Sequence, residues 1–432
     1  MKKKALFVYP RFARHADSHP ELRQFVPMNE YLGSPSLGFA AIAAATPDDW
    51  TIEFRDDRVV DGAAPTDADL VALSFFTPAA TRGLELADHF RAQGHTVVSG
   101  GIFTTAMPDV AARHVDAVVI GEGEEAWPRL LADLERGELA PRYHAAPLDA
   151  ATLRRPKTEI YFEAEKDGAR PDDYPLQLSR GCPLSCHACI LPHSMGDALR
   201  AFPIEYVIAQ LEVMEAHGKR ACLTEDTSWL PGAGRRVLEA LFDYLIARGA
   251  GATVSYVGTS FPMIRITPKS LLDKAKAAGI DMFYLVTGFD PLSIRGFGQG
   301  SQSALDRAAE AVAKSFDAGI EPYASFLYGS DSDDEGTVDR ILEFCDRTGI
   351  RKAEFAIATP YPATPEWKRL LAEGRLLTEE WRLYNDANPV FRAQKLDPDQ
   401  VVDGYIRLWR EFYAHRGPTI DGMSQYERII QF

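Results

Sequence analysis

The most informative stretch of this sequence is Ser179-Arg-Gly-Cys182-Pro-Leu-Ser-Cys186-His-Ala-Cys189. It directly follows an apolar run at 176–178 that we expect to form a β-strand. Three cysteines with this spacing put three thiolates on one loop, where they can hold a small iron–sulfur cluster. A cubane 4Fe–4S cluster usually takes four cysteines, so one iron would keep the open coordination site of a catalytic metal.

Two alternatives use the same cysteines. A zinc ion could bind these thiolates together with His187 or His193, and the thiols could also be unmodified. The remaining cysteines, Cys222 and Cys345, stand alone in apolar surroundings, so the chain carries no disulfide framework. Clustered thiolates favour a reducing compartment, which predicts a cytoplasmic protein.

Apolar runs and helical patterns alternate on both sides of the cysteine stretch. Between residues 173 and 360 we predict a six-unit partial (β/α) barrel, because too little chain remains for eight units. Its expected strands are 176–178, 221–224, 253–257, 282–286, 321–327 and 352–358. Its expected helices are 204–216, 235–248, 269–278, 303–317 and 334–347.

The first 140 residues predict a separate α/β domain, a doubly wound parallel sheet of the Rossmann or flavodoxin-like kind. Its expected strands are 5–9, 51–54, 70–74, 96–99 and 117–120, and its clearest helices are 81–93 and 126–135. Proline-punctuated residues 141–172 predict a linker. Residues 361–432 predict a small C-terminal helical appendage, with helices near 366–373 and 398–415.

The composition excludes some partners. The formal net charge is −15 and no basic cluster is present, which argues against a nucleic-acid partner and leaves a small-molecule substrate. No window reaches the ~18 uninterrupted apolar residues of a membrane-spanning helix, so we expect no transmembrane segment.

The spacing of Cys182, Cys186 and Cys189 resembles the motif of the radical S-adenosylmethionine enzymes, whose fold is also a partial barrel. The resemblance implies that S-adenosylmethionine binds the fourth iron and is cleaved to a 5′-deoxyadenosyl radical. It also implies a flavodoxin- or ferredoxin-type electron donor and a brown, oxygen-sensitive protein. Ala188 departs from the pattern, because many members have an aromatic residue before the last cysteine.

The same resemblance implies further cofactor contacts at three strand ends of the barrel. Thr224, Glu225 and Asp226 end the second strand, where members place polar groups towards the methionyl amine. Asp226 would equally suit an acidic helix N-terminus. The other positions that match are Thr287, Gly288 and Asp290 near the ribose, and Pro360 near the adenine.

Small residues also follow the strands of the N-terminal domain, where doubly wound sheets bind ligands. The candidates are Ser74, Phe75, Thr77, Gly100, Gly101, Ile102, Gly121, Glu122 and Gly123. Taken alone, this domain favours ordinary strand-to-helix turns at these positions.

From Pro35 to Glu124 the sequence is also similar to the cobalamin-binding domain fused to many radical enzymes, in the branch of the anaerobic magnesium-protoporphyrin cyclase and the hopanoid and phosphonate methylases. An Asp-x-His-x-x-Gly motif is missing. The alternative is therefore a domain that has lost cobalamin and only shapes the cavity.

Both modules together imply a radical S-adenosylmethionine enzyme that uses methylcobalamin to methylate an unactivated carbon of a small molecule. Oxidative cyclisation, ring rearrangement or oxygenation is the alternative within the family, and a zinc- or thiol-binding protein is the alternative outside it. Tyr328 and Tyr361 are catalytic candidates, and Trp229 is a further cavity candidate; core packing is the alternative for each ring. Residues 11–31, with His15 and His19, are expected to cover the active site.

Overall fold

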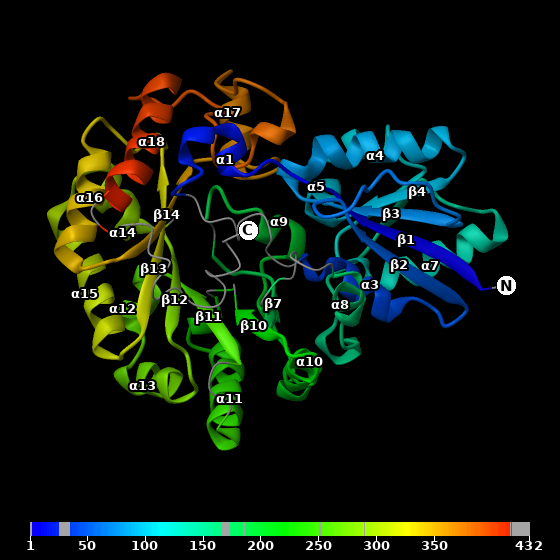
Figure 1. Ribbon diagram of the computed structural model, residues 1–432, viewed down its shortest axis with the longest axis horizontal. Helices are drawn as coiled ribbons and strands as arrows, with labels where there is room; N and C mark the ends of the chain where they lie inside the picture. Colours follow the sequence, from blue (N-terminus) through cyan, green and yellow to red (C-terminus); the bar gives the residue numbers. More distant parts are fainter. Residues whose placement is uncertain are drawn as a thin grey trace.

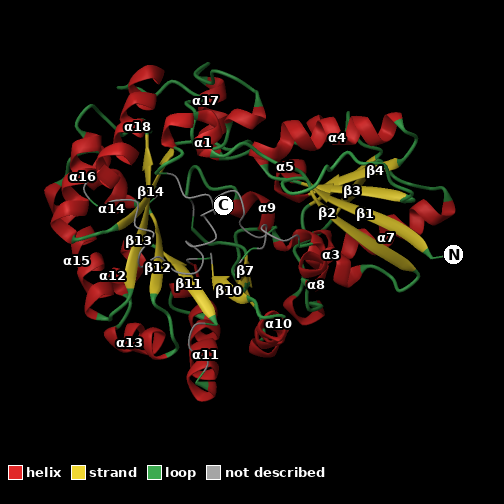
Figure 2. Ribbon diagram, in the orientation of Figure 1, coloured by secondary structure: helices red, strands yellow, loops and turns green. Residues whose placement is uncertain are grey.

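Two α/β lobes lie side by side, the N-terminal lobe on the right of Figure 1 and the barrel lobe on the left. Strands and helices alternate in both, which confirms the predicted α/β class (Figure 2). This computed structural model describes residues 2–25, 35–165, 171, 173–184, 186–223, 225, 227–249, 253–288, 290–414 and 416. No described helix is long and apolar enough to cross a membrane.

The N-terminal lobe contains a parallel sheet with the strand order β2-β1-β3-β4-β5-β6. The strands are β1 (Lys3–Tyr9), β2 (Trp50–Asp56), β3 (Leu70–Ser74), β4 (Thr96–Gly100), β5 (Ala117–Ile120) and β6 (Arg142–His144). This is the flavodoxin-like order, and its switch point lies between β1 and β3.

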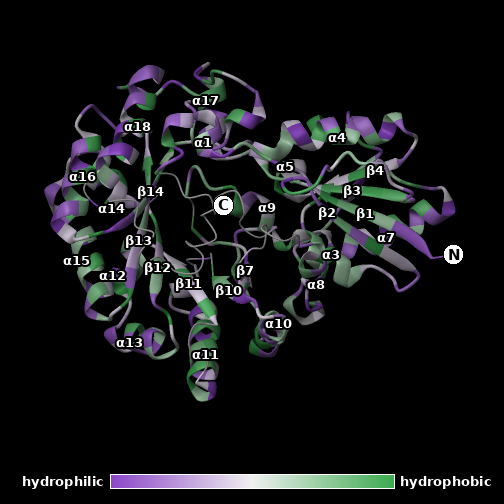
Figure 3. Ribbon diagram, viewed as in Figure 1, coloured by the Kyte–Doolittle hydropathy of each residue, from purple (hydrophilic) through white to green (hydrophobic). Residues whose placement is uncertain are grey.

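Helices cover both faces of this sheet. One face holds α3 (Leu37–Ala45) and α7 (Gly123–Arg136), and the other holds α4 (Ala80–Ala92), α5 (Gly101–Ala106) and α6 (Pro108–Ala111). Along β1, Ala5 and Phe7 pack towards the first face, whereas Leu6 and Val8 pack towards the second. Burial on both sides explains why the central strands contain short apolar runs, as in β3 and β4, which are green in Figure 3.

The second lobe contains six parallel strands in the order β14-β13-β12-β11-β10-β7, which is the predicted partial barrel. The strands are β7 (Asp173–Pro175), β10 (Arg220–Leu223), β11 (Val254–Thr259), β12 (Met282–Val286), β13 (Glu321–Tyr328) and β14 (Lys352–Ile357). The helices are α10 (Ile204–Ala216), α11 (Ala233–Arg248), α12 (Phe261–Ile266), α13 (Lys269–Ala277), α14 (Pro291–Ser293), α15 (Gln302–Asp317) and α16 (Thr337–Thr348).

The first barrel strand lies earlier than predicted. The expected strand at 176–178 is not one: β7 pairs with β10 through Asp173–Pro175 instead. Its polar residue Asp173 is buried and accepts a hydrogen bond from Ser255 Oγ (2.7 Å). Because that partner comes from β11, no local pattern could reveal that a carboxylate belongs to a buried strand.

The segment predicted as a linker is a packed joint between the lobes. It contains β6, which extends the N-terminal sheet beyond residue 140, and α8 (Glu159–Ala164). Tyr161 Oη donates to Ser36 O (2.5 Å) and accepts from Ala40 N (3.0 Å), and its ring stacks on Tyr174 of β7. One buried tyrosine therefore connects α3 of the first lobe with the first strand of the second.

The C-terminal segment bridges the lobes as well. After α17 (Pro365–Ala372), Trp381 contacts Phe103 of α5 (ring centroids 5.4 Å apart), and Glu380 accepts a hydrogen bond from Thr81 Oγ1 (2.8 Å). The last described helix, α18 (Pro398–Ala414), packs on the barrel next to α16. A segment near the N-terminus also contacts the barrel lobe. Its helix α1 (His15–Ser18) lies against α18, where His15 Nδ1 and Tyr405 Oη are hydrogen-bonded (2.8 Å).

We expect Tyr161→Phe to lower the free energy of unfolding by about 1–3 kcal/mol, because Ser36 O and Ala40 N lose a buried partner. Tyr244→Phe is the matched control: it removes an exposed hydroxyl bound to Glu212 and should cost less than about 0.5 kcal/mol. Denaturant unfolding of both variants is the measurement. Equal losses would contradict the role given to Tyr161.

Candidate active site

The cysteine loop leaves the barrel at the carboxyl end of β7 and is closed by a short antiparallel ladder. Its two strands are β8 (Ser179–Arg180) and β9 (Arg200–Ala201), and the loop between them carries α9 (Leu191–Met195). Cys182 is buried, and Cys186 and Cys189 are partly exposed. The backbone folds the loop back on itself, because Cys182 N donates to Gly196 O (3.1 Å) and Cys189 N donates to Cys186 O (3.2 Å).

Gly181 allows the loop to close. Its φ is +80°, and a Cβ atom there would lie 2.2 Å from Ala198 O, a contact that no side chain tolerates. Ala198 lies on the returning side of the loop, so the residue before Cys182 must be glycine for the two sides to approach.

The structure gives the zinc alternative no support. Within the described part of the chain, no three His, Cys, Asp or Glu side chains are grouped so that they could hold one metal ion. His187 contributes a backbone contact, since its carbonyl accepts from Glu366 N of α17 (3.1 Å). Burial and the nearby charge of Lys368 lower the pKa of His193.

The described residues predicted to contact a cofactor at the barrel strand ends make hydrogen bonds or close contacts with neighbouring parts of the barrel. Thr224 and Asp226 lie outside the described residues. Between them, Glu225 accepts hydrogen bonds from Leu178 N (2.6 Å) and Ser179 Oγ (2.7 Å), so its carboxylate supports the start of the cysteine stretch.

Farther round the barrel, Thr287 Oγ1 donates to Ser325 O (2.6 Å) and Pro360 is buried. Gly288 has φ +99° and lies so close to Leu327 that a Cβ atom would clash (2.3 Å). Asp290 caps α14 by accepting from Leu292 N and Ser293 N, and burial raises the pKa of its carboxyl.

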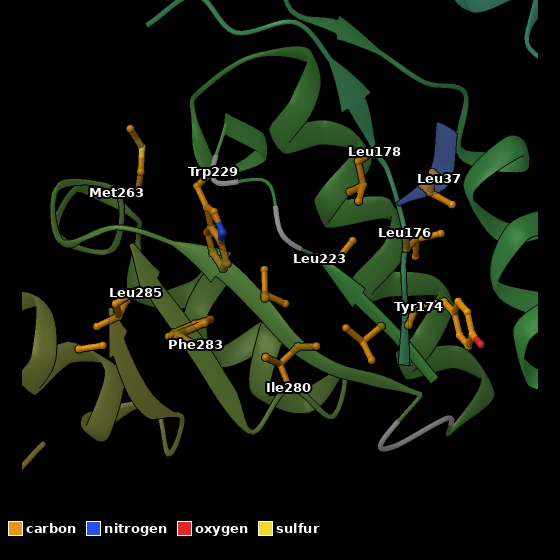
Figure 4. Packing of buried hydrophobic residues seen from close by; sticks show 14 of the residues in the cluster. Leu37, Tyr174, Leu176, Leu178, Leu223, Trp229, Met263, Ile280, Phe283 and Leu285 are labelled. Atoms are coloured by element: carbon orange, nitrogen blue, oxygen red, sulfur yellow. The ribbon is translucent and has the colours of Figure 1, made fainter. Parts of the chain in front are cut away.

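The aromatic candidates lie away from the cavity described below. Trp229 is fully buried, donates to Gly258 O (2.9 Å) and packs among Leu223 and Phe283 of the barrel core (Figure 4). Its prediction as a cavity residue is wrong, because the ring faces the helices that cover the sheet. Tyr328 packs against Gly404 of α18, and burial raises its pKa to about 12.

Tyr361 has a carboxylate partner. Its hydroxyl donates to Asp386 (2.8 Å to either oxygen), and burial together with this carboxylate raises its pKa.

A cavity of about 520 Å³ opens at the switch point of the N-terminal sheet. Its walls contain eight of the nine positions predicted there, namely Ser74, Phe75, Gly100, Gly101, Ile102, Gly121, Glu122 and Gly123. Thr77 is buried beside it, at the start of a 3₁₀ turn. Gly101 has φ +89°, and its Cβ atom would lie 2.7 Å from Ser74 Oγ, so a side chain cannot replace its hydrogen.

The other wall of the cavity comes from the barrel lobe. Pro175, Gln177 and Arg180 lie before the cysteines, and Ser194 and Met195 lie on α9. The prediction missed these residues, although Arg180 stands in the cysteine stretch itself. Figure 4 shows Leu37 of α3 beside Leu176 and Leu178, so the two lobes pack together next to the cavity.

Charged residues join the two walls. Arg180 forms ion pairs with Glu122 (3.0 Å) and Glu124 (2.6 Å), and Arg200 also pairs with Glu122. Burial opposes the ionisation of Glu122, yet the hydrogen bond from Arg200 and the charge of Arg180 hold its pKa below the ordinary value. Glu122, predicted as a cofactor contact, thus has both carboxylate oxygens engaged by the cysteine loop.

Comparisons with known proteins agree with this arrangement. Residues 33–131 match the B12 binding domain family. Bacteriochlorophyllide d C-8(2)-methyltransferase of Chlorobaculum tepidum is 25% identical over 404 residues, which cover 87% of this chain and 86% of that one. Hopanoid C-2 methylase of Rhodopseudomonas palustris is 24% identical over 95% of this chain and 76% of its own.

A solved structure shares the fold. The radical S-adenosylmethionine methyltransferase TsrM of Kitasatospora setae, solved with cobalamin and a 4Fe–4S cluster, superposes with a TM-score of 0.64 at 15% identity. The match covers 86% of this chain and 78% of that one. Together these comparisons confirm the predicted resemblance to cobalamin-binding radical S-adenosylmethionine enzymes.

We expect Gly181→Ala to lose most of the iron bound after anaerobic reconstitution, because a side chain at this position prevents the cysteine loop from closing. Gly137→Ala is the control. This glycine also has positive φ (+72°), at the end of α7, but nothing lies within 4 Å of its Cβ position. Iron per chain is the readout, with far-UV circular dichroism to check folding. Full iron binding by Gly181→Ala would contradict this account of the loop.

Proposed function

We propose that this chain, whose resemblance to cobalamin-binding radical S-adenosylmethionine enzymes spans most of its length, is a C-methyltransferase acting on a small molecule. The observation that carries the proposal is the cavity whose two walls are the ligand-binding edge of the N-terminal sheet and the cysteine loop. The barrel-side wall is formed by residues on either side of the three cysteines, so a cofactor held by each lobe would lie next to this space.

The residues present fit both groups. Cys182, Cys186 and Cys189 offer three thiolates from one loop, which matches a 4Fe–4S cluster with one iron left for S-adenosylmethionine. Gly100, Gly101 and other small residues let a large flat ligand approach the sheet edge. When bound, the cluster would supply radical chemistry and cobalamin would supply methyl transfer.

The chain itself then binds, orients and excludes water. Phe39, Phe75, Val98, Val119 and Trp127 make the cavity mainly apolar, which limits access of water to reactive species. We further propose that Glu225, Thr287, Gly288, Asp290 and Pro360 form the S-adenosylmethionine site at the barrel strand ends. Thr224 and Asp226 stay candidates for the same site by their position in the sequence. Tyr328 and Tyr361 remain the proposed catalytic candidates, although each already has a structural contact.

The conditions of the reaction follow from the cofactors. Reduction of the cluster requires an electron, which we propose comes from a flavodoxin- or ferredoxin-type protein. Thiolate ligation requires reduced cysteines, which favours the cytoplasm.

We expect the triple variant Cys182→Ala, Cys186→Ala, Cys189→Ala to lose reductive cleavage of S-adenosylmethionine, because no thiolate remains to hold iron. Cys345→Ala, which removes a buried thiol on α16, should retain it. The assay is 5′-deoxyadenosine formed by the anaerobically reconstituted protein with dithionite. Cleavage by the triple variant would contradict the proposal.

A second assay separates methyl transfer from the other radical reactions. With methyl-deuterated S-adenosylmethionine, added hydroxocobalamin and titanium(III) citrate to reduce the cobalt, we expect the label in the cobalamin recovered from the protein. Formation of 5′-deoxyadenosine without label in the cobalamin would instead support cyclisation, rearrangement or oxygenation.

A further inference from the structure

Four charged side chains meet where the cysteine loop touches the N-terminal lobe. Arg180 and Arg200 come from the two strands of the β8–β9 ladder, and Glu122 and Glu124 follow β5. Their side chains are only 6–19% exposed. Charges at this depth are costly to bury unless each one is paired, so the pairing constrains how the two lobes fit together.

The two arginines face each other directly in the ladder register. Like charges opposite one another destabilise a strand pair, so this ladder depends on an anion between them. Glu122 supplies that anion: its Oε2 atom accepts from Arg180 Nη1 (3.0 Å) and Arg200 Nη1 (3.1 Å), and its Oε1 atom accepts from Arg200 Nη2. One carboxylate of the N-terminal lobe therefore closes the base of the cysteine loop.

Further hydrogen bonds extend this contact in both directions. Arg200 also donates to Met195 O (2.6 Å) at the end of α9 and to Leu148 O (2.8 Å) in the segment after β6. Leu148 N donates to Glu122 Oε2 (3.2 Å). The base of the loop, its helix and the N-terminal lobe thus share one polar network. Bidentate guanidinium–carboxylate pairs fix direction as well as distance.

We infer that Glu122 is a positioning residue that sets where the cysteine loop sits relative to the glycine-lined cavity. Given the proposed function, it thereby sets the position of the cluster relative to the cobalamin. General adhesion of the lobes does not require this network, because they are also joined at α8 and by the contacts of Trp381. Glu122 also lines the cavity. It pairs with both arginines, whereas the ion pair of Glu124 is with Arg180.

The test measures the geometry directly in Glu122→Gln. The amide keeps the shape of the side chain, but it removes the charge and turns an NH₂ group towards guanidinium donors. Reduced cluster and cob(II)alamin are both paramagnetic, so pulsed EPR reports their dipolar coupling without turnover. We expect a broadened or shifted coupling in the variant. Methyl transfer per 5′-deoxyadenosine should also fall at least about tenfold, because misplaced reacting groups lose effective concentration.

Two further variants keep the test decisive. Asp57→Asn is the matched control, because Asp57 is a buried carboxylate that makes a bidentate pair with Arg82 (2.8 and 3.0 Å) inside the N-terminal lobe, away from the cysteine loop. Its dipolar coupling should equal that of the unaltered protein. Arg200→Lys keeps the positive charge but loses the bidentate contact, so it should fold and show a smaller change of the same kind.

The outcomes separate the two claims. An unchanged coupling in both Glu122→Gln and Arg200→Lys would overturn the positioning role and leave the proposed function intact. If Glu122→Gln does not fold, Arg200→Lys alone decides. Failure of the unaltered protein to bind cobalamin would instead overturn the proposed function, and the inference with it.

Discussion

Parallel strands place all their carboxyl-terminal loops at one edge of a sheet, and in this protein two such edges meet. The glycine turns of one sheet and the cysteine loop of the other therefore line a single cavity. A reaction that uses two large cofactors needs both of them next to one substrate. A single sheet edge could not hold both, so the meeting of the two edges is the constraint on which such a reaction depends.

Several contacts among the described residues join the lobes, and three of them use different physical chemistry. The α8 joint relies on a buried tyrosine that is hydrogen-bonded to one lobe and stacked on the other. The C-terminal segment relies on aromatic packing of Trp381 against Phe103. The Glu122 network relies on charge, and it reaches the base of the cysteine loop. Bidentate charged contacts fix direction as well as distance, which is why we assign the positioning role to the Glu122 network.

The parts of the fold that were predicted from sequence are those set by local burial. Strands such as β3 and β12 are covered on both faces, so they stand out as short apolar runs and their predicted limits were confirmed. The strands that were not predicted, β6 and β7, have local sequences that do not indicate whether they are buried. β6 is a short edge strand with an exposed Arg142 and His144 on either side of a buried tyrosine. β7 contains a buried aspartate and a proline, and its partners come from distant parts of the chain.

The candidate site divides in the same way. The three cysteines and the glycine turns are each contiguous in sequence, so a motif could indicate them. Glu122 is 58 residues from Arg180 and 78 residues from Arg200, and no local pattern joins residues so far apart. Trp229 illustrates a further limit, because an aromatic residue at a strand end can face either the cavity or the covering helices. Its burial against Phe283 became evident only in three dimensions.

The metal content of the anaerobically reconstituted protein tests the central claim most directly. After incubation with iron, sulfide and hydroxocobalamin and removal of the excess, iron, cobalt and zinc are measured per chain. The account predicts about four iron atoms per chain, held by the cysteine loop, and about one cobalt atom per chain. Zinc in place of iron, or iron without any cobalt, would contradict the claim that one cavity brings both cofactors together.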